Sequence, residues 1–215
     1  MNVLIIGANG LIGQMITDKM QADAAFTPTA FIRNEAQRQS FESRGVATVV
    51  ASLEGSVAEI AATMAGQDAV IFTAGSGSKT GADKTLTVDL DGAVKAMEAA
   101  QQMNVRRFVM VSALRADNRE AWEGSPIKPY FVAKHYADRI LLAMDLDYTI
   151  LRPGRLFNDP GTGKVTIHNP AAQKGVNRED VATLAVEVLR HENTIRKVIA
   201  FNEGDQPIRE VVAEI

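Results

Sequence analysis

The first thirteen residues constrain the fold more than any other part of the chain. They read MNVLIIGANGLIG, so a short apolar run leads directly into glycines at positions 7, 10 and 13. The run at residues 3–6 is β-branched and aliphatic, which is typical of a strand buried on both faces of a parallel sheet. From Leu11 to Met20, apolar residues recur at helical spacing. The segment therefore predicts a tight turn between a strand and a helix.

Glycine at these three positions has a physical purpose. Gly7 permits the tight turn, Gly10 lets backbone N–H groups approach a pyrophosphate, and Gly13 allows the helix to pack closely on the strand. The positive end of the helix favours phosphate. A glycine turn without a ligand is the simpler interpretation, but the flanking strand and helix favour a bound dinucleotide. The cofactor-binding residues predicted from this turn are Gly7, Asn9, Gly10, Leu11, Ile12 and Gly13.

Strand-like and helix-like patterns alternate along the rest of the chain. Strand-like runs lie at residues 3–6, 29–32, 47–51, 69–73, 107–111, 148–151 and 198–201. Helical spacing of apolar residues occurs at 11–22, 35–43, 57–64, 85–103, 131–144 and 180–190. This order predicts an α/β fold with a doubly wound parallel sheet, in which ligands bind beyond the carboxyl ends of the strands. Further cofactor contacts are accordingly expected at Arg33, Thr73, Ala74, Gly75 and Pro153.

Length and composition limit the function classes. A chain of 215 residues suits a single domain, with residues from about 153 to 215 contributing the substrate side. The net charge of −3 gives no electrostatic reason to expect nucleic acid, so small-molecule partners are predicted. No apolar run reaches the roughly 20 residues of a membrane span. The chain also begins on a core strand and contains no cysteine, which predicts a cytoplasmic protein.

Several polar residues are assigned structural or solvent-facing roles. His135, His168 and His191 lie in separate segments without metal-ligand spacing, so no metal site is predicted. Asp89 and its helix neighbours Asp91 and Glu98 are expected to be solvated or at the edge of the packing. Two glycine-containing loops follow strands: the loop at 75–81 is expected beside the nicotinamide or to be a flexible connector, and the loop at 158–163 is expected to shape the substrate pocket.

The residue at the end of the second strand indicates which dinucleotide binds. NAD-binding versions of such a fold carry an acidic residue there to hold the adenosine ribose, but this chain has Arg33. A guanidinium offers permanent charge and several donors to the 2′-phosphate of NADP, so NADP(H) is predicted over NAD(H). Arg38 is a second candidate for this contact. The alternative is a solvated Arg33 preceding a helix that Asn34 caps.

A catalytic set is predicted from three residues. Tyr130 and Lys134 are four apart at the start of a helical segment, so they share a helix face. A neighbouring cation favours phenolate, which would bring proton transfer by Tyr130 closer to neutral pH. Ser112 ends the strand at 107–111 and could stabilise a developing oxyanion. The alternatives are a partly buried tyrosine, a solvated lysine and a serine that simply ends a strand.

Together, these residues resemble the atypical short-chain dehydrogenase/reductase family, and most closely its NmrA-like, flavin/biliverdin-reductase-like and epimerase/dehydratase-like members. The motifs that carry the resemblance are Gly7-Ala-Asn-Gly-Leu-Ile-Gly13, Val88-Asp-Leu-Asp-Gly92, Val111-Ser112, Tyr130-x-x-x-Lys134, Leu151-Arg-Pro-Gly154 and Arg178-Glu-Asp-Val-Ala182. The resemblance implies a Rossmann-type fold, NADP(H), and a catalytic set of Ser112, Tyr130 and Lys134, with Lys134 also holding the nicotinamide ribose. The helical segments at 85–103 and 131–144 are compatible with a homodimer as in many relatives, and equally with a monomer. One departure is Ser52-Leu53, where many relatives carry an acidic residue beside the adenine.

Three hypotheses for function follow. The first is an NADPH-dependent oxidoreductase that reduces a small carbonyl or related electrophile. The second is a non-catalytic NADP(H)-binding sensor of the NmrA type, which the intact Tyr130 and Lys134 disfavour. The third is hydride transfer to a flavin or tetrapyrrole, for which Tyr130 is dispensable.

Overall fold

Strands and helices alternate along the computed structural model, which describes residues 1–77, 80–167 and 174–215. The strands are β1 (Asn2–Ile6), β2 (Thr27–Ile32), β3 (Ala47–Val50), β4 (Ala69–Phe72), β5 (Arg107–Val111), β6 (Asp147–Pro153), β7 (Arg155–Phe157), β8 (Lys164–Thr166), β9 (Gly175–Asn177), β10 (Lys197–Glu203) and β11 (Gln206–Pro207). The helices are α1 (Leu11–Gln21), α2 (Arg38–Glu42), α3 (Val57–Ala62), α4 (Ala82–Lys84), α5 (Asp91–Gln102), α6 (Lys128–Ala143), α7 (Arg178–Glu187) and α8 (Ile208–Ala213). His168 and part of the loop at 75–81 lie outside the described residues.

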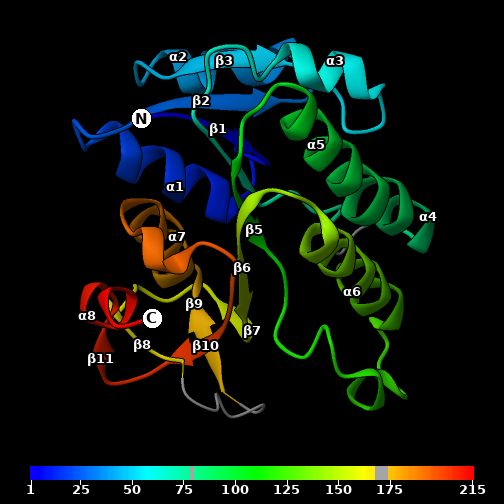
Figure 1. The fold of residues 1–215 in the computed structure, drawn as a ribbon, viewed down its shortest axis with the longest axis vertical. Coiled ribbons are helices and arrows are strands. Elements are labelled where there is room, and N and C mark those ends of the chain that lie inside the picture. The colour runs from blue at the N-terminus through cyan, green and yellow to red at the C-terminus, as the bar shows by residue number, and fades with distance from the viewer. Residues whose placement is uncertain (78–79, 168–173) are drawn as a thin grey trace.

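The main sheet has the order β11-β8-β10-β6-β5-β4-β1-β2-β3 (Figure 1). From β3 to β10 neighbouring strands are parallel, and β8 then pairs with β10 in the antiparallel sense. Because the chain crosses from β3 back to β4 on the other side of β1, the sheet is doubly wound. The predicted Rossmann-type α/β fold is confirmed. The short strands β7, β8, β9 and β11 escaped prediction because two or three residues carry no periodicity.

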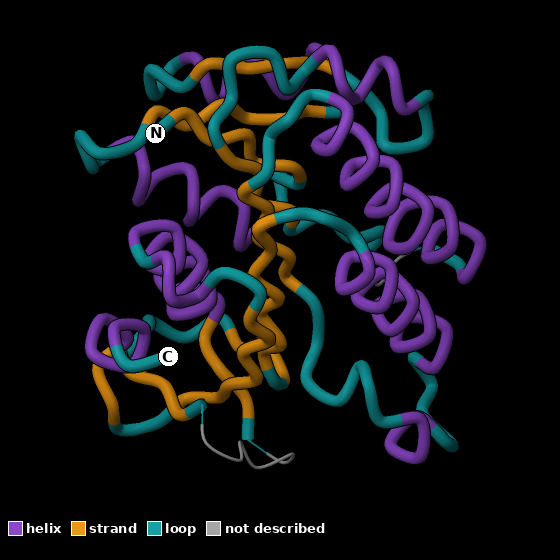
Figure 2. Tube along the Cα trace, in the orientation of Figure 1, coloured by secondary structure: helices purple, strands orange, loops and turns teal. Residues whose placement is uncertain are grey.

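Helices cover both faces of the sheet, as Figure 2 shows in purple and orange. In β1, Val3 and Ile5 enter the core beneath α1 and α7, whereas Leu4 and Ile6 enter the core beneath α3, α5 and α6. All four side chains are fully buried, because alternate residues of a strand point to opposite faces. Within the described ranges, no helix combines the length and apolar composition needed to cross a bilayer.

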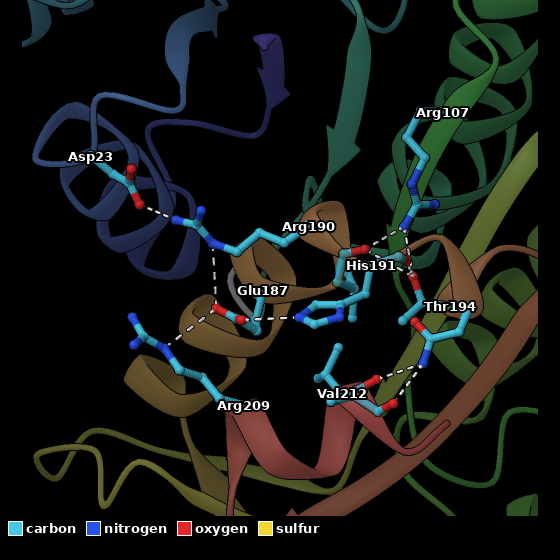
Figure 3. Close-up of polar contacts among 11 residues, drawn as sticks. Asp23, Arg107, Glu187, Arg190, His191, Thr194, Arg209 and Val212 are labelled. Atoms are coloured by element: carbon cyan, nitrogen blue, oxygen red, sulfur yellow. Dashed lines mark hydrogen bonds and ion pairs between the residues drawn. The ribbon is translucent and has the colours of Figure 1, made fainter.

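A polar cluster anchors the end of α7 to the amino ends of the strands (Figure 3). Glu187 accepts from His191 and forms ion pairs with Arg190 and Arg209, and Arg190 also pairs with Asp23 beyond α1. Arg107, the first residue of β5, donates to the Val188 carbonyl and to the Thr194 hydroxyl, while burial lowers the pKa of Arg107 to about 10. The glycine turn follows the carboxyl end of β1, so this cluster lies at the opposite end of the sheet, where it joins α7 to β5 and to the residues after α1.

Candidate active site

The glycine turn between β1 and α1 is packed too tightly for side chains. Gly7 has a φ of +91°, and a Cβ on it would lie 2.5 Å from the Ala74 nitrogen beyond β4. A Cβ on Gly13 would lie 2.2 Å from the Gly7 carbonyl oxygen. The Gly10 N–H donates to that oxygen at 2.9 Å and closes the turn. The predicted roles of Gly7 in turning and of Gly13 in close packing therefore have a direct steric basis.

The beginning of α1 suits the diphosphate of a dinucleotide. Gly10 is the N-cap residue and contributes no side-chain hydrogen bond, and the first turn of α1 contains no acidic residue. A Cβ on Gly10 would approach only the Gly7 oxygen, at 3.3 Å. The free N–H groups and the positive helix end thus face an uncrowded surface, which fits the group that the fold implies.

Next to this turn lies a first cavity of about 300 Å³. It is lined by Gly7, Asn9, Gly10, Phe31, Ile32, Arg33, Gln37, Ala51, Ser52, Leu53, Glu54, Thr73, Ala74, Gly75, Ser76 and Val88. Apolar walls formed by Phe31 and Leu53, together with Arg33 at the end of β2, suit an adenosine with a further anionic group.

The two arginines near this cavity differ in their partners. The Arg33 guanidinium is exposed and forms no ion pair with any residue in the described ranges, so its donors are available. By contrast, Arg38 is held by Glu35 and Glu42, which raise the pKa of Arg38. Asn34 does cap the turn that follows, as the alternative interpretation expected, and Arg33 lines the cavity at the same time.

A second cavity of about 760 Å³ continues from the first and shares Gly10, Thr73, Gly75 and Ser76 with it. Its lining is Gly10, Leu11, Ile12, Thr73, Gly75, Ser76, Gly77, Thr80, Gly81, Ala82, Thr85, Asp89, Pro126, Ile127, Pro129, Tyr130 and Arg178. The described part of the loop at 75–81 thus lies along this cavity, together with the predicted catalytic Tyr130. A site of this size, mostly apolar with a few polar groups, is typical of small-molecule binding.

Tyr130 and Lys134 lie on one face of α6, as their spacing predicted. The Lys134 ammonium is 5.7 Å from the centre of the Tyr130 ring and donates to the Val111 carbonyl at 3.2 Å. Burial lowers the pKa of Lys134. Burial also raises the pKa of Tyr130, and the negative charges of Asp89 and Asp138 raise it further. The pKa of Tyr130 is thus raised where a lowering by Lys134 was expected, because burial and the two nearby carboxylates disfavour the phenolate.

Asp89 is buried, although it was expected in solvent or at the edge of the packing. Its side chain is 1% exposed, lines the second cavity, and accepts a hydrogen bond from the Ser76 N–H at 2.8 Å. It lies in a π-helical turn at Thr85–Leu90 that precedes α5, and such turns often mark functional sites. Asp91 and Glu98, in contrast, are exposed as expected. Sequence patterns missed Asp89 because its partner lies thirteen residues away in a loop.

Behind Tyr130, α6 buries a third polar residue of the same face. Asp138 accepts from Arg152 at 2.9 Å, and Arg152 also pairs with Asp117. Burial raises the pKa of Asp138, although Arg152 opposes this. The buried Ser112 hydroxyl lies near Asp138 and favours its ionised form, but Oγ makes no hydrogen bond of standard geometry with any described residue.

Most of the predicted site residues meet around the two cavities, at the carboxyl ends of the central strands. Those that do not line either cavity are Gly13, Ser112, Lys134 and Pro153. Gly13 packs on the turn, and Pro153 ends β6, where its carbonyl accepts from the Leu114 N–H at 2.7 Å. Asp89 and Arg178 line the second cavity without having been predicted, whereas Ser76 belongs to the loop at 75–81 that was expected beside the nicotinamide. Arg178 belongs to one of the motifs that carry the family resemblance, but no role was predicted for it.

Comparisons with known proteins agree with this geometry. The sequence model of a family described as NAD(P)H-binding matches residues 7–192. A Bacillus subtilis (strain 168) protein called "Uncharacterized sugar epimerase YhfK" is 50% identical over 215 residues, which is 100% of both chains. A solved structure from Bacillus halodurans, described as an NAD-dependent epimerase/dehydratase, has a TM-score of 0.93 and 38% identity over 100% of both chains. The oxidoreductase ylbE from Lactococcus lactis has a TM-score of 0.89 and 30% identity, covering 100% of this chain and 96% of that one.

Proposed function

Because the chain belongs to the NAD(P)H-binding family, we propose that it is an NADP(H)-dependent oxidoreductase that reduces a small carbonyl compound or related electrophile. The observation that carries this proposal is the position of Tyr130. Its side chain lines the second cavity, which continues from the glycine turn, and Lys134 lies behind it on the same helix face. A proton donor thus stands beside the place where a nicotinamide would lie.

The preference for NADP(H) rests on Arg33. Among the described residues that line the first cavity, Glu54 is the only carboxylate, and Lys84 and Thr87 bind that group. Within this described lining, Arg33 is the charged residue whose side chain is available to an incoming ligand. Its guanidinium would form charge-assisted hydrogen bonds with a 2′-phosphate, whereas the hydroxyl of NAD would gain much less.

Three side chains of this protein act in the reaction, and two more hold them in place. When bound, the reduced nicotinamide supplies the hydride. The carbonyl carbon accepts that hydride, the C=O π bond breaks, and the oxygen takes the phenolic proton of Tyr130. Ser112, whose buried Oγ makes no standard hydrogen bond with a described residue, stabilises the developing oxyanion after a rotation of its side chain. Lys134 stabilises the phenolate left on Tyr130, and Asp138 and Arg152 hold the end of this helix face in place.

A second candidate function is hydride transfer to a flavin or tetrapyrrole. Two observations favour it: Ser112 and Lys134 do not line the cavity, and burial raises the pKa of Tyr130. Such a reaction needs neither an oxyanion partner nor a tyrosine acid.

The test is NADPH oxidation with a panel of aldehydes, ketones, quinones and flavins. It compares wild type with Tyr130→Phe, which removes only the hydroxyl. The matched control is Tyr136→Phe, because Tyr136 lies on the same helix but is 40% exposed and bonds Arg119.

Carbonyl reduction that is lost in Tyr130→Phe and kept in Tyr136→Phe would support the main proposal. Turnover of flavins or quinones by both variants would support the second candidate. Saturable NADPH binding without turnover of any acceptor would contradict both and favour a cofactor-binding sensor.

A further inference from the structure

The described lining of the second cavity contains one accessible charge. Among the lining residues that the structure describes, only Asp89 and Arg178 are charged, and Asp89 is buried and already accepts the Ser76 N–H. Arg178, the first residue of α7, is partly exposed and lines the same cavity as Tyr130. A ligand that enters this cavity therefore meets a guanidinium.

The acidic neighbours of Arg178 do not neutralise it, because both hold a loop instead. Glu179 accepts from the Gly161 N–H at 2.9 Å and pairs with Lys19. Asp180 accepts from the N–H groups of Thr162 and Gly163, at 2.9 and 2.7 Å. In the Arg178-Glu-Asp motif, the two carboxylates thus fix the loop at 158–163 and are not paired with the arginine.

The same loop holds the guanidinium. Arg178 Nη1 donates to Asn158 Oδ1 at 2.6 Å, and Asn158 is a neutral partner. No carboxylate in the described part of the chain pairs with Arg178. The contact restricts the side chain without using its charge, and the remaining donors can still bind an anion.

We propose that Arg178 binds a carboxylate of the substrate, so that the preferred substrates are carbonyl compounds with an apolar body and an acidic group. Leu11, Ile12 and Ile127 supply apolar wall to the same cavity. An arginine fork matches the geometry of a carboxylate, and a partly desolvated site strengthens the contact. This inference rests on the proposed function, since it names the substrate class of the same site.

Binding of 4-acetylbenzoate and of its methyl ester tests the proposal. The two ketones differ chiefly in charge, and calorimetry on NADP⁺-loaded protein measures their binding without hydride transfer. The variants are Arg178→Gln and Arg178→Lys. The control is Arg209→Gln, because the Arg209 side chain is 84% exposed on α8, outside the cavity.

Wild type is expected to bind the acid more tightly than the ester. Arg178→Gln should weaken acid binding by about ten-fold or more, because a charge-assisted hydrogen bond is lost, and should change ester binding by less than about three-fold. The affinity of Arg178→Lys for the acid should lie between those of wild type and Arg178→Gln, since lysine keeps the charge but lacks the two-pronged guanidinium. Arg209→Gln should match wild type.

Equal losses for acid and ester, no preference for the acid in wild type, or no binding of either ketone would each overturn the proposal. So would a loss of NADP⁺ affinity in Arg178→Gln, which would assign the arginine to the cofactor. Failure of the proposed function looks different, because the acid would then bind with the expected dependence on Arg178 while no ketone is reduced.

Discussion

Asp138 and Arg152 form an ion pair of 2.9 Å in which the two side chains are only 1% and 9% exposed. Asp138 lies four residues after Lys134 and eight after Tyr130, so all three share one face of α6. The pair thus connects the helix that carries the predicted catalytic residues to β6.

Replacing Asp138 with Asn should destabilise the protein, because it leaves the buried Arg152 charge with Asp117 alone. Loss of one partner of a buried pair costs about 3 kcal/mol in the free energy of unfolding. Urea unfolding followed by circular dichroism measures this. The control is Asp145→Asn, whose exposed ion pairs with Arg106 and Arg196 should contribute little. Equal and small decreases in the free energy of unfolding of Asp138→Asn and Asp145→Asn would contradict a structural role for the buried pair.

Alanine at two positions of the glycine turn should have different effects. Gly13→Ala places a methyl group 2.2 Å from the Gly7 oxygen, a backbone clash that no rotamer relieves, so stability should fall by about 2 kcal/mol or more. Gly10→Ala meets only a 3.3 Å contact and should fold normally, yet it should weaken cofactor binding about ten-fold by crowding the helix end. Thermal unfolding and NADPH titration separate the two effects, and unchanged NADPH affinity in Gly10→Ala would argue against a diphosphate at this turn.

Arg33→Ala should reduce the preference for NADPH over NADH by about ten-fold or more, since a charge-assisted contact to the 2′-phosphate is lost. Fluorescence titration with both cofactors gives the ratio. Arg38→Ala is the matched control, because Glu35 and Glu42 already hold that guanidinium. If the ratio of NADPH to NADH affinity changed in Arg38→Ala and not in Arg33→Ala, the 2′-phosphate contact would be assigned to Arg38.

The raised pKa of Tyr130 predicts the pH dependence of reduction. The phenol is the proton donor, and a pKa above the usual 10.0 keeps it protonated. The rate of the chemical step should therefore show no loss from tyrosine ionisation between pH 7 and about pH 10. Oxidation of an alcohol needs phenolate, so that direction should speed up as pH rises.

Single-turnover rates over this range check the prediction. Asp89→Asn removes a charge that raises the pKa of Tyr130, so it should shift any alkaline limb of the profile to lower pH. A wild-type reduction rate that falls with an apparent pKa near 7 or 8 would contradict a protonated, desolvated phenol.

Local patterns predicted much of this molecule. The glycines at 7, 10 and 13 indicated the turn, and the apolar runs indicated β1 to β6 and β10, because each signal depends on neighbouring residues. The spacing of Tyr130 and Lys134 likewise placed both on one helix face. Arg33 lines the first cavity because a strand end positions it.

Long-range packing decided the rest. Sequence patterns placed Asp89 in solvent or at the edge of the packing, but the fold buries it and it accepts a hydrogen bond from the Ser76 N–H. The same packing raises the pKa of Tyr130 where the helix spacing alone predicted a lower value. Arg178 was visible in a motif, yet only the loop contacts of Glu179 and Asp180 show which charge of that motif remains available. The sequence by itself therefore determined the fold and the elements of the site, whereas burial, charge pairing and pKa depended on residues brought together from distant segments, which no local pattern encodes.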